Sequence, residues 1–259
     1  MRISLGIEYD GTNFSGWQIQ GHACTIQGRL EEALSKVADH RVRVSCAGRT
    51  DAGVHAQGQV VHFDTDVLRN MHSWVAGTNA NLPHEICVLW AQVVSTEFHA
   101  RYSAVSRYYR YVIFNRKVRP SFLASRVAWD YRPLDESRMS HAARYLIGEH
   151  DFTSFRDSEC QARSPVRNVM RLDVSRQGEL IFLDVVANAF LHHMVRNIAG
   201  VLMDIGAGKK GPEWAKQVRD AKDRRLGGVT APPGGLYLMS VEYPADFSIP
   251  HLPQRLAVW

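Results

Sequence analysis

The sequence predicts an α+β fold made of two halves, each with a mainly antiparallel sheet. Segments that alternate apolar and polar residues, as half-buried strands do, are interspersed with segments whose apolar residues recur at helical spacing. In the first half the predicted order is strand, helix, strand, strand, helix, strand, which is the split βαβ order of ferredoxin-like folds. The second half follows a loosely similar order of elements, without a repeat at the level of residues.

The first half is predicted to span residues 1–104. Residues 3–9 alternate like a strand until Asp10-Gly11 interrupts them, and Thr25 is a suitable N-cap for a helix over residues 26–37. Further strands are expected at residues 42–46, 59–63 and 85–94, with a second helix at residues 71–78. A glycine-flanked loop, Gly48–Gly58, joins the strand expected at residues 42–46 to the strand expected at residues 59–63.

The second half is predicted to span residues 105–259. Strands are expected at residues 108–115, 126–131 and 236–241, and a hairpin at residues 168–175 and 179–186 around Gln177-Gly178. Helices are expected at residues 134–148, 189–205 and 212–223. The tail from Pro244 contains three prolines and is expected to lie on the surface.

The net charge of +5 suggests a polyanionic partner, and the charge is local. Between Phe98 and Trp129 there is no Asp or Glu, but there are seven cations: Arg101, Arg107, Arg110, Arg116, Lys117, Arg119 and Arg126. Tyrosines are interleaved with them, and cations with aromatic faces are what RNA-binding proteins offer to phosphates and unstacked bases. The stretch is equally compatible with a solvated strand that has tyrosines packed beneath it.

Composition excludes several classes of protein. Hydrophobic residues make up 45% and charged residues 22% of the chain, which is an ordinary globular balance. The cysteines form no CxxC pair, so reduced core thiols are expected rather than a zinc site or disulfides. Glu8 and Asp10 interrupt any secretory leader, and no run is apolar enough to span a membrane, so a cytoplasmic protein is expected. Neither a P-loop nor a GxGxxG motif is present.

The loop around Asp51 is the most unusual segment. Asp51 lies between Arg49 and His55, and the flanking Gly48 and Gly53 allow the backbone to approach a ligand closely. A nearby cation favours the carboxylate form, which suits a nucleophile or a proton acceptor. The alternative is a turn aspartate that binds local amides.

The expected helix at residues 189–205 is apolar around most of its circumference. The remaining narrow strip carries His192, His193, Arg196 and Gly200. Because a cation on a buried helix needs an anion, Asp51 is one candidate partner of Arg196. In the alternative interpretation Arg196 reaches solvent or pairs with Asp204 or another local acid.

Two other chemistries are considered and disfavoured. His55 and His62 with His192 and His193 could form a metal site, but adjacent histidines usually point apart on a helix and no HExxH motif is present. Cys46 follows Val42 and Val44 on an alternating strand, so it is expected in the core rather than as a nucleophile. We therefore expect no metal.

Taken together, these segments resemble the TruA family of tRNA pseudouridine synthases along nearly the whole chain. The most specific motif is Gly48-Arg49-Thr50-Asp51-Ala52-Gly53-Val54-His55. Others occur in the family's order: Glu8-Tyr9-Asp10-Gly11, Gly16-Trp17-Gln18, Asn79-Ala80-Asn81-Leu82-Pro83, Phe98-His99-Ala100-Arg101, Arg107-Tyr108-Tyr109-Arg110-Tyr111, Asp151-Phe152-Thr153-Ser154-Phe155, Phe190-Leu191-His192-His193-Met194-Val195-Arg196-Asn197 and Gly235-Leu236-Tyr237-Leu238.

The resemblance implies the pseudouridine synthase fold, with two ferredoxin-like halves flanking a central basic cleft. It implies an isomerase that converts uridine to pseudouridine at positions 38, 39 and 40 of the tRNA anticodon stem-loop, with the target base flipped out of its stack. No cofactor and no metal are expected, because nothing is oxidised and no group leaves. The resemblance also implies a homodimer in which one tRNA contacts both subunits.

The resemblance implies roles for five residues. Asp51 would be the catalytic carboxylate, attacking the base or the sugar or abstracting the 2′ proton. Tyr109 would stack on the uracil and handle the C5 proton, and Arg196 would hold Asp51 by a salt bridge. Arg49 would fill the space left by the target nucleotide, and Leu236 would form a pocket wall. The alternatives to this function are a non-catalytic RNA-binding module and a histidine-ligated metal hydrolase.

Overall fold

The computed structural model describes residues 1–250, which fall into two compact units. Unit 1 comprises Met1–Ser106 and residues 237–250, and unit 2 comprises Arg107–Leu236. The last strand, expected with the second half, lies almost wholly in unit 1. Its Tyr237 and Leu238 pair in parallel with His55 and Ala56, a long-range partner that a local pattern does not reveal.

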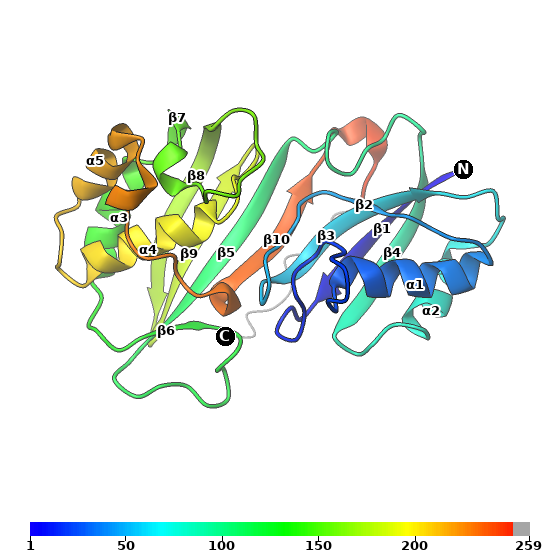
Figure 1. Ribbon diagram of the computed structural model, residues 1–259, viewed down its shortest axis with the longest axis horizontal. Coiled ribbons are helices and arrows are strands. Elements are labelled where there is room, and N and C mark those ends of the chain that lie inside the picture. Colours follow the sequence, from blue (N-terminus) through cyan, green and yellow to red (C-terminus); the bar gives the residue numbers. More distant parts are fainter. Residues whose placement is uncertain (251–259) are drawn as a thin grey trace. The chain divides into compact units, whose positions relative to one another are not determined.

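Unit 1 is a sheet with two helices packed against it (Figure 1). Its strands are β1 (Arg2–Tyr9), β2 (Ser45–Cys46), β3 (His55–Asp64), β4 (Ile86–Val94) and β10 (Leu236–Glu242), and its helices are α1 (Ile26–Ala38) and α2 (Met71–Asn79). The sheet order is β4-β1-β3-β10, and β2 also pairs with β3. β1 is antiparallel to both of its neighbours, so the predicted split βαβ order is confirmed here.

The core of unit 1 forms where the apolar stripe of α1 meets β1. Ile26, Leu30 and Leu34 recur at helical spacing and are buried, and Ile3 and Leu5 on β1 are completely covered. The Thr25 side chain accepts a hydrogen bond from the Gly28 N–H, as expected of an N-cap. This packing fixes the sheet that carries the loop before β3.

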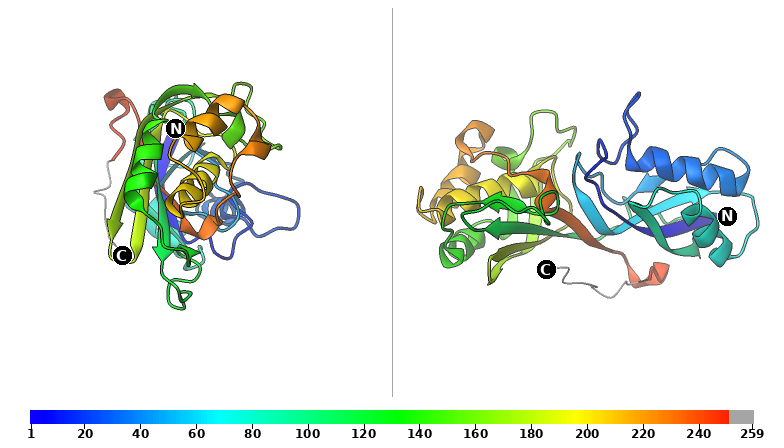
Figure 2. Two further views of the ribbon diagram at one scale, coloured as in Figure 1. Left: turned by 90° about the vertical axis from the view of Figure 1, so that its left-hand side faces the viewer. Right: turned by 90° about the horizontal axis from the view of Figure 1, so that it is seen from below.

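Unit 2 also places helices against one sheet (Figure 2). Its strands are β5 (Ser106–Asn115), β6 (Ala128–Asp130), β7 (Gly148–Asp151), β8 (Val166–Gln177) and β9 (Leu180–Ala187), and its helices are α3 (Glu136–Arg144), α4 (Met194–Gly206) and α5 (Trp214–Ala221). β5, β9, β8 and β7 follow one another in antiparallel pairs, and β6 runs parallel to β5. The predicted α+β class with mainly antiparallel sheets is therefore confirmed.

Short 3₁₀ helices connect several of these elements. They are η1 (Thr153–Phe155), η2 (Arg224–Leu226), η3 (Pro233–Gly235) and η4 (Ala245–Phe247). The tail from Pro244 packs its Phe247 ring against Phe98 in unit 1, with centroids 5.2 Å apart. The rest of that predicted tail, residues 251–259, lies outside the described residues.

Several predicted boundaries are wrong, each for an identifiable structural reason. α4 starts at Met194 rather than near residue 189, because His193 takes a left-handed conformation (φ 61°) that helical backbone excludes. β3 starts at His55 rather than Gln59, because β10 pairs with its first residues. α3 ends at Arg144, and the residues that follow include the unpredicted edge strand β7.

Two further expectations concern thiols and membranes. Cys24, Cys46, Cys87 and Cys160 are free thiols, but the expected core position is wrong for Cys24, which is exposed, and the other three are half-buried. Among residues 1–250, no helix combines the length and the apolar character that crossing a membrane requires.

Candidate active site

The loop that carries Asp51 lies between β2 and β3 and is anchored by the N-terminal segment of unit 1. The Thr50 carbonyl accepts the Trp17 N–H at 2.9 Å, and the Thr50 hydroxyl bonds the buried Tyr9 hydroxyl at 2.8 Å. The Asp51 carbonyl accepts the Val54 N–H at 3.2 Å, which closes a turn around the aspartate. The residue before Asp51 is thus held through both its backbone and its side chain.

Glycines allow this close contact between segments far apart in the sequence. A Cβ on Gly11 would lie 2.0 Å from the Val54 carbonyl oxygen, and one on Gly16 would lie 2.9 Å from the Thr50 carbonyl oxygen. Gly16 also has φ +87°, which an L side chain rarely adopts. The Asp10-Gly11 and Gly16-Trp17 motifs therefore form the support of the Asp51 loop.

The start of the loop is held by a buried amide. The Gln59 side chain donates to the Gly48 carbonyl at 2.6 Å and accepts the Gly48 N–H at 3.3 Å. Arg49 comes next and is exposed, whereas Asp51 is half-buried.

Neither the cysteine nor the histidines near this loop form a second reactive site within unit 1. Burial raises the pKa of Cys46 to about 12, so it is a thiol rather than a thiolate at neutral pH. The Nδ1 atom of His55 accepts the Gly11 N–H, and that of His62 accepts the Ala100 N–H, both at 3.1 Å. Each Nδ1 atom is thus occupied by a backbone N–H, and the two histidines lie seven residues apart on β3.

Three tyrosines on β5 in unit 2 have different surroundings. The Tyr108 hydroxyl donates to Asp184 at 2.6 Å, and the Tyr111 hydroxyl donates to the Pro232 carbonyl at 2.8 Å. Tyr109 lies on the same face of β5 as Tyr111 and packs edge-on against Phe190, with centroids 4.9 Å apart. Tyr109 is therefore the one of the three whose ring meets the segment leading into α4.

Arg196 lies in the first turn of α4 and is fixed against the segment before β10. Its Nε donates to the Ala231 carbonyl at 2.9 Å, and its own carbonyl accepts the Ala231 N–H at 3.1 Å. The alternative partner Asp204 is engaged elsewhere, by Arg132 at 2.8 Å and Lys209 at 3.0 Å. The interpretation in which Arg196 pairs with Asp204 is therefore wrong.

Leu236 marks the point where the chain passes from unit 2 back to unit 1. It is buried, with 6% of its surface exposed, and follows η3. A Cβ on the preceding Gly235 would lie 2.7 Å from the Val112 carbonyl oxygen, so this glycine lets the chain run close to β5. The Gly235-Leu236 motif has this structural basis.

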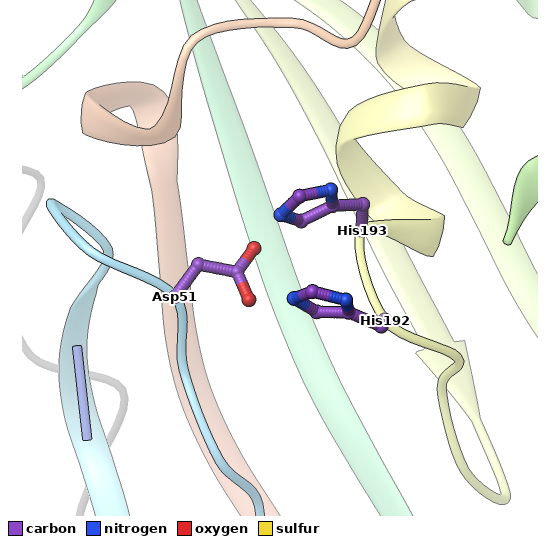
Figure 3. Close-up of side chains that lie close together, drawn as sticks. All are labelled: Asp51, His192 and His193. Atoms are coloured by element: carbon purple, nitrogen blue, oxygen red, sulfur yellow. The ribbon is translucent and has the colours of Figure 1, made fainter. Parts of the chain in front are cut away.

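His192 and His193 lie side by side rather than pointing apart, contrary to expectation (Figure 3). Their ring centroids are 4.0 Å apart. Both residues precede α4, and His193 has a left-handed backbone conformation that turns the chain. The rule that adjacent side chains on a helix point in different directions therefore does not hold for them. The Nδ1 atom of His193 lies 2.9 Å from an Asp157 carboxylate oxygen, and that of His192 lies 3.7 Å from the other. These histidines help to lower the pKa of Asp157, after the backbone hydrogen bond from Glu159.

The predicted site residues are divided between the two units. Arg49 and Asp51 lie in unit 1, whereas Tyr109, Arg196 and Leu236 lie in unit 2. The salt bridge between Asp51 and Arg196 stays a prediction. Within unit 2, Tyr111 and Arg196 are both held by the segment at residues 231–232. Asp157 was missed, because its 36-residue separation from His193 leaves no local signal.

Comparison with known proteins decides the family. The tRNA pseudouridine synthase family matches residues 6–103 and 142–244, which contain the Asp51 loop and α4. The chain belongs to this family. It is 57% identical to the tRNA pseudouridine synthase A of Coxiella burnetii over 252 residues, covering 97% of each chain. It is 58% identical to that of Nitrosococcus oceani over 259 residues, all of both chains, and 59% identical to that of Pseudomonas aeruginosa over 250 residues, 96% of this chain and 88% of the relative.

Because the chain belongs to the tRNA pseudouridine synthase family, the anchored Asp51 loop can be considered in relation to that reaction. The two glycine contacts and the Thr50 anchors hold the loop with the half-buried Asp51 carboxylate against the N-terminal segment. A reacting group gains most when its position is fixed before the substrate arrives. The support of the loop therefore suits a carboxylate that acts on a bound nucleotide.

Proposed function

We propose that this protein isomerises uridine to pseudouridine at positions 38, 39 and 40 of the tRNA anticodon stem-loop, with Asp51 as the catalytic carboxylate. The observation that carries the proposal is the anchored loop, in which Thr50, next to Asp51, is held through both its backbone carbonyl and its side-chain hydroxyl. Family membership and the 57–59% identity to tRNA pseudouridine synthases A support it.

The reaction is a rearrangement of one nucleotide. The bond between N1 of uracil and C1′ of the ribose breaks, the uracil turns, and C5 forms the new bond to C1′. The proton on C5 is then released and N1 gains one, so that atoms and electrons balance without an oxidant, a metal or a leaving group. Asp51 starts the reaction at the base, at the sugar or at the 2′ proton, and these three routes remain alternatives.

Four further residues have proposed roles around Asp51. Tyr109 stacks on the turned uracil and handles the C5 proton, and the buried setting of its ring against Phe190 fits a stacking surface. Arg196 holds Asp51 by a salt bridge. The exposed Arg49 fills the space that the flipped nucleotide leaves, and Leu236 forms an apolar wall.

The proposed setting is a cytoplasmic homodimer, with one tRNA contacting both subunits. A target uridine in a stem must leave its stack to meet Asp51, at a cost of a few kcal/mol that is smallest near a loop. This favours uridines at the loop end of the anticodon stem. The non-catalytic RNA-binding alternative is not favoured, because the loop that carries Asp51 is intact.

The position claim can be tested with tRNAs that carry C5-tritiated uridine at only one of positions 38, 39 or 40. We expect tritium release from each of these three tRNAs. We expect none from a control tRNA whose only tritiated uridines lie in the acceptor stem. Release from the acceptor-stem substrate alone would refute the proposed target site while leaving pseudouridine synthesis intact. The assay is run in EDTA, because the proposed chemistry uses no metal.

A further inference from the structure

Arg167, near the start of β8, has a guanidinium group whose hydrogen bonding is incomplete. Its Nη1 donates to the carbonyls of Ser164 and Val166, at 2.9 and 2.6 Å. Its Nε is fully buried and has no hydrogen-bond partner. Buried donors without a partner are rare in proteins, and each one calls for an explanation.

The charge of this side chain is also unbalanced. Among residues 1–250 no carboxylate lies within 4.0 Å of the Arg167 guanidinium. Burial lowers the pKa of Arg167, and the only group that opposes this is the Cys160 thiol. The cross-strand neighbour of Arg167 is His150, which adds no negative charge. A partly desolvated cation in such surroundings is stabilised by a bound anion.

The sheet register puts the Arg167 side chain on the same face of the unit 2 sheet as Tyr109. Arg107 pairs with Ala187, and Ala187 pairs with Val169 on β8. Arg167 comes two residues before Val169, and Tyr109 comes two residues after Arg107, so the side chains of all four point to one face while Arg167 and Tyr109 lie about four residues apart along the strands. Two strand spacings of about 4.8 Å separate β5 from β8.

We propose that Arg167 binds a backbone phosphate of the tRNA strand that carries the target uridine. The inference rests on the proposed function for the position of the target base, and adds a contact to the nucleic acid that the family motifs do not identify. The two carbonyls hold Nη1 and so orient the guanidinium plane, Nε is enclosed, and Nη2, which has no hydrogen bond to residues 1–250 and is not buried, is the nitrogen that meets the phosphate. Arg167 is a binding residue, not a catalytic one.

The test measures the affinity of full-length tRNA for wild type and Arg167→Gln between about 50 and 200 mM KCl. We expect Kd to rise about tenfold at low salt, the effect of losing one charge-assisted hydrogen-bonded contact. The slope of log K against log salt should fall by about one, because one phosphate contact is lost. KM should rise while kcat stays unchanged, since the contact is the same in ground and transition states.

The matched control is Arg171→Gln on the same strand. A register shift between Val169 and Arg171 turns Arg171 to the opposite face of β8, where it lies over the Tyr108 ring and pairs with Asp173, so its loss should leave the salt slope unchanged. Arg167→Lys keeps the charge and should restore most of the slope. Arg167→Gln removes the unpaired buried donor together with the two Nη1 hydrogen bonds, so its melting temperature should stay close to that of wild type.

Two results would overturn the assignment. A wild-type Kd and salt slope for Arg167→Gln would show that no phosphate is bound there, and a lower melting temperature with an unchanged slope would show a structural role. Inorganic phosphate distinguishes the source of the anion. If millimolar phosphate stabilised wild type but not Arg167→Gln, and tRNA affinity were unchanged, the site would bind free phosphate instead. These binding measurements need no turnover, so they stand apart from the role of Asp51.

Discussion

At the residue scale, the neighbours of each tyrosine on β5 define what it can do. The hydroxyls of Tyr108 and Tyr111 are used in hydrogen bonds that hold the fold together, to Asp184 and to the Pro232 carbonyl. Burial, with the hydrogen bond to Asp184, raises the pKa of Tyr108 to about 12. The ring of Tyr109 instead packs on Phe190 at the entrance to α4. This division predicts different results for two conservative substitutions.

Removing the Tyr109 hydroxyl should impair chemistry more than binding. In Tyr109→Phe the ring still stacks, so tRNA affinity should stay within about twofold. Loss of the group that handles the C5 proton should lower kcat by about 100-fold or more. The control Tyr108→Phe loses its bond to Asp184, so it should lower stability by about 1–3 kcal/mol with little change in kcat. Equal kcat values for the two variants would contradict the assignment.

His62 predicts a pH dependence of stability. Its Nδ1 accepts the Ala100 N–H, and burial, helped by His99 and Arg2, lowers its pKa from 6.5 to about 4. Because the folded pKa lies below the unfolded value, the stabilisation is complete above about pH 6.5 and is lost as pH falls towards 4. Urea unfolding should therefore show stability falling across this window.

The control for this pH dependence is His62→Asn, whose amide oxygen can accept the same N–H without titrating. Its stability should fall less steeply than that of wild type between pH 6.5 and 4. Parallel pH profiles for the two proteins would contradict the role given to His62.

At the element scale, α4 depends on one glycine. A Cβ on Gly200 would lie 1.9 Å from the Val229 carbonyl oxygen, and the same segment continues to the Ala231 carbonyl that holds Arg196. Gly200→Ala should therefore destabilise the fold by about 1–3 kcal/mol and lower turnover by moving Arg196. Denaturant unfolding and tritium release measure the two effects.

The matched control is another helical glycine, Gly77 on α2. A Cβ there would lie 3.1 Å from the end of the Val37 side chain, which can move, and alanine gains helix propensity. Gly77→Ala should keep its stability within about 1 kcal/mol of wild type and its turnover unchanged. A Gly200→Ala variant as stable and active as Gly77→Ala would contradict the proposed packing.

Elements with a strong local period could be predicted from the sequence, and those set by distant partners could not. The apolar spacing of Ile26, Leu30 and Leu34 predicts α1, and Thr25 predicts its start. The start of β3 depends on β10, almost 200 residues later, and the start of α4 depends on the left-handed His193. In the same way, Asp51 can be recognised from its sequence motif. Asp157 and Arg167 can be recognised as candidate functional residues only from their neighbours in the structure.

At the scale of the whole molecule, the chain leaves unit 1 at residue 106 and returns after Leu236. The proposed site residues therefore come from two units that each bury their own core. Sedimentation equilibrium tests the proposed homodimer directly, and we expect twice the mass of one chain, with one tRNA bound across two subunits. A single-chain mass at every concentration, with full activity, would contradict it.

The most direct test of the whole account is tritium release from C5-labelled uridine in a tRNA anticodon stem-loop, for wild type and Asp51→Asn, in EDTA. The account predicts release by wild type and none by Asp51→Asn, with tRNA affinity and melting temperature preserved in the variant. Release by a folded Asp51→Asn at a rate comparable to wild type would contradict the assignment of Asp51 as the catalytic carboxylate.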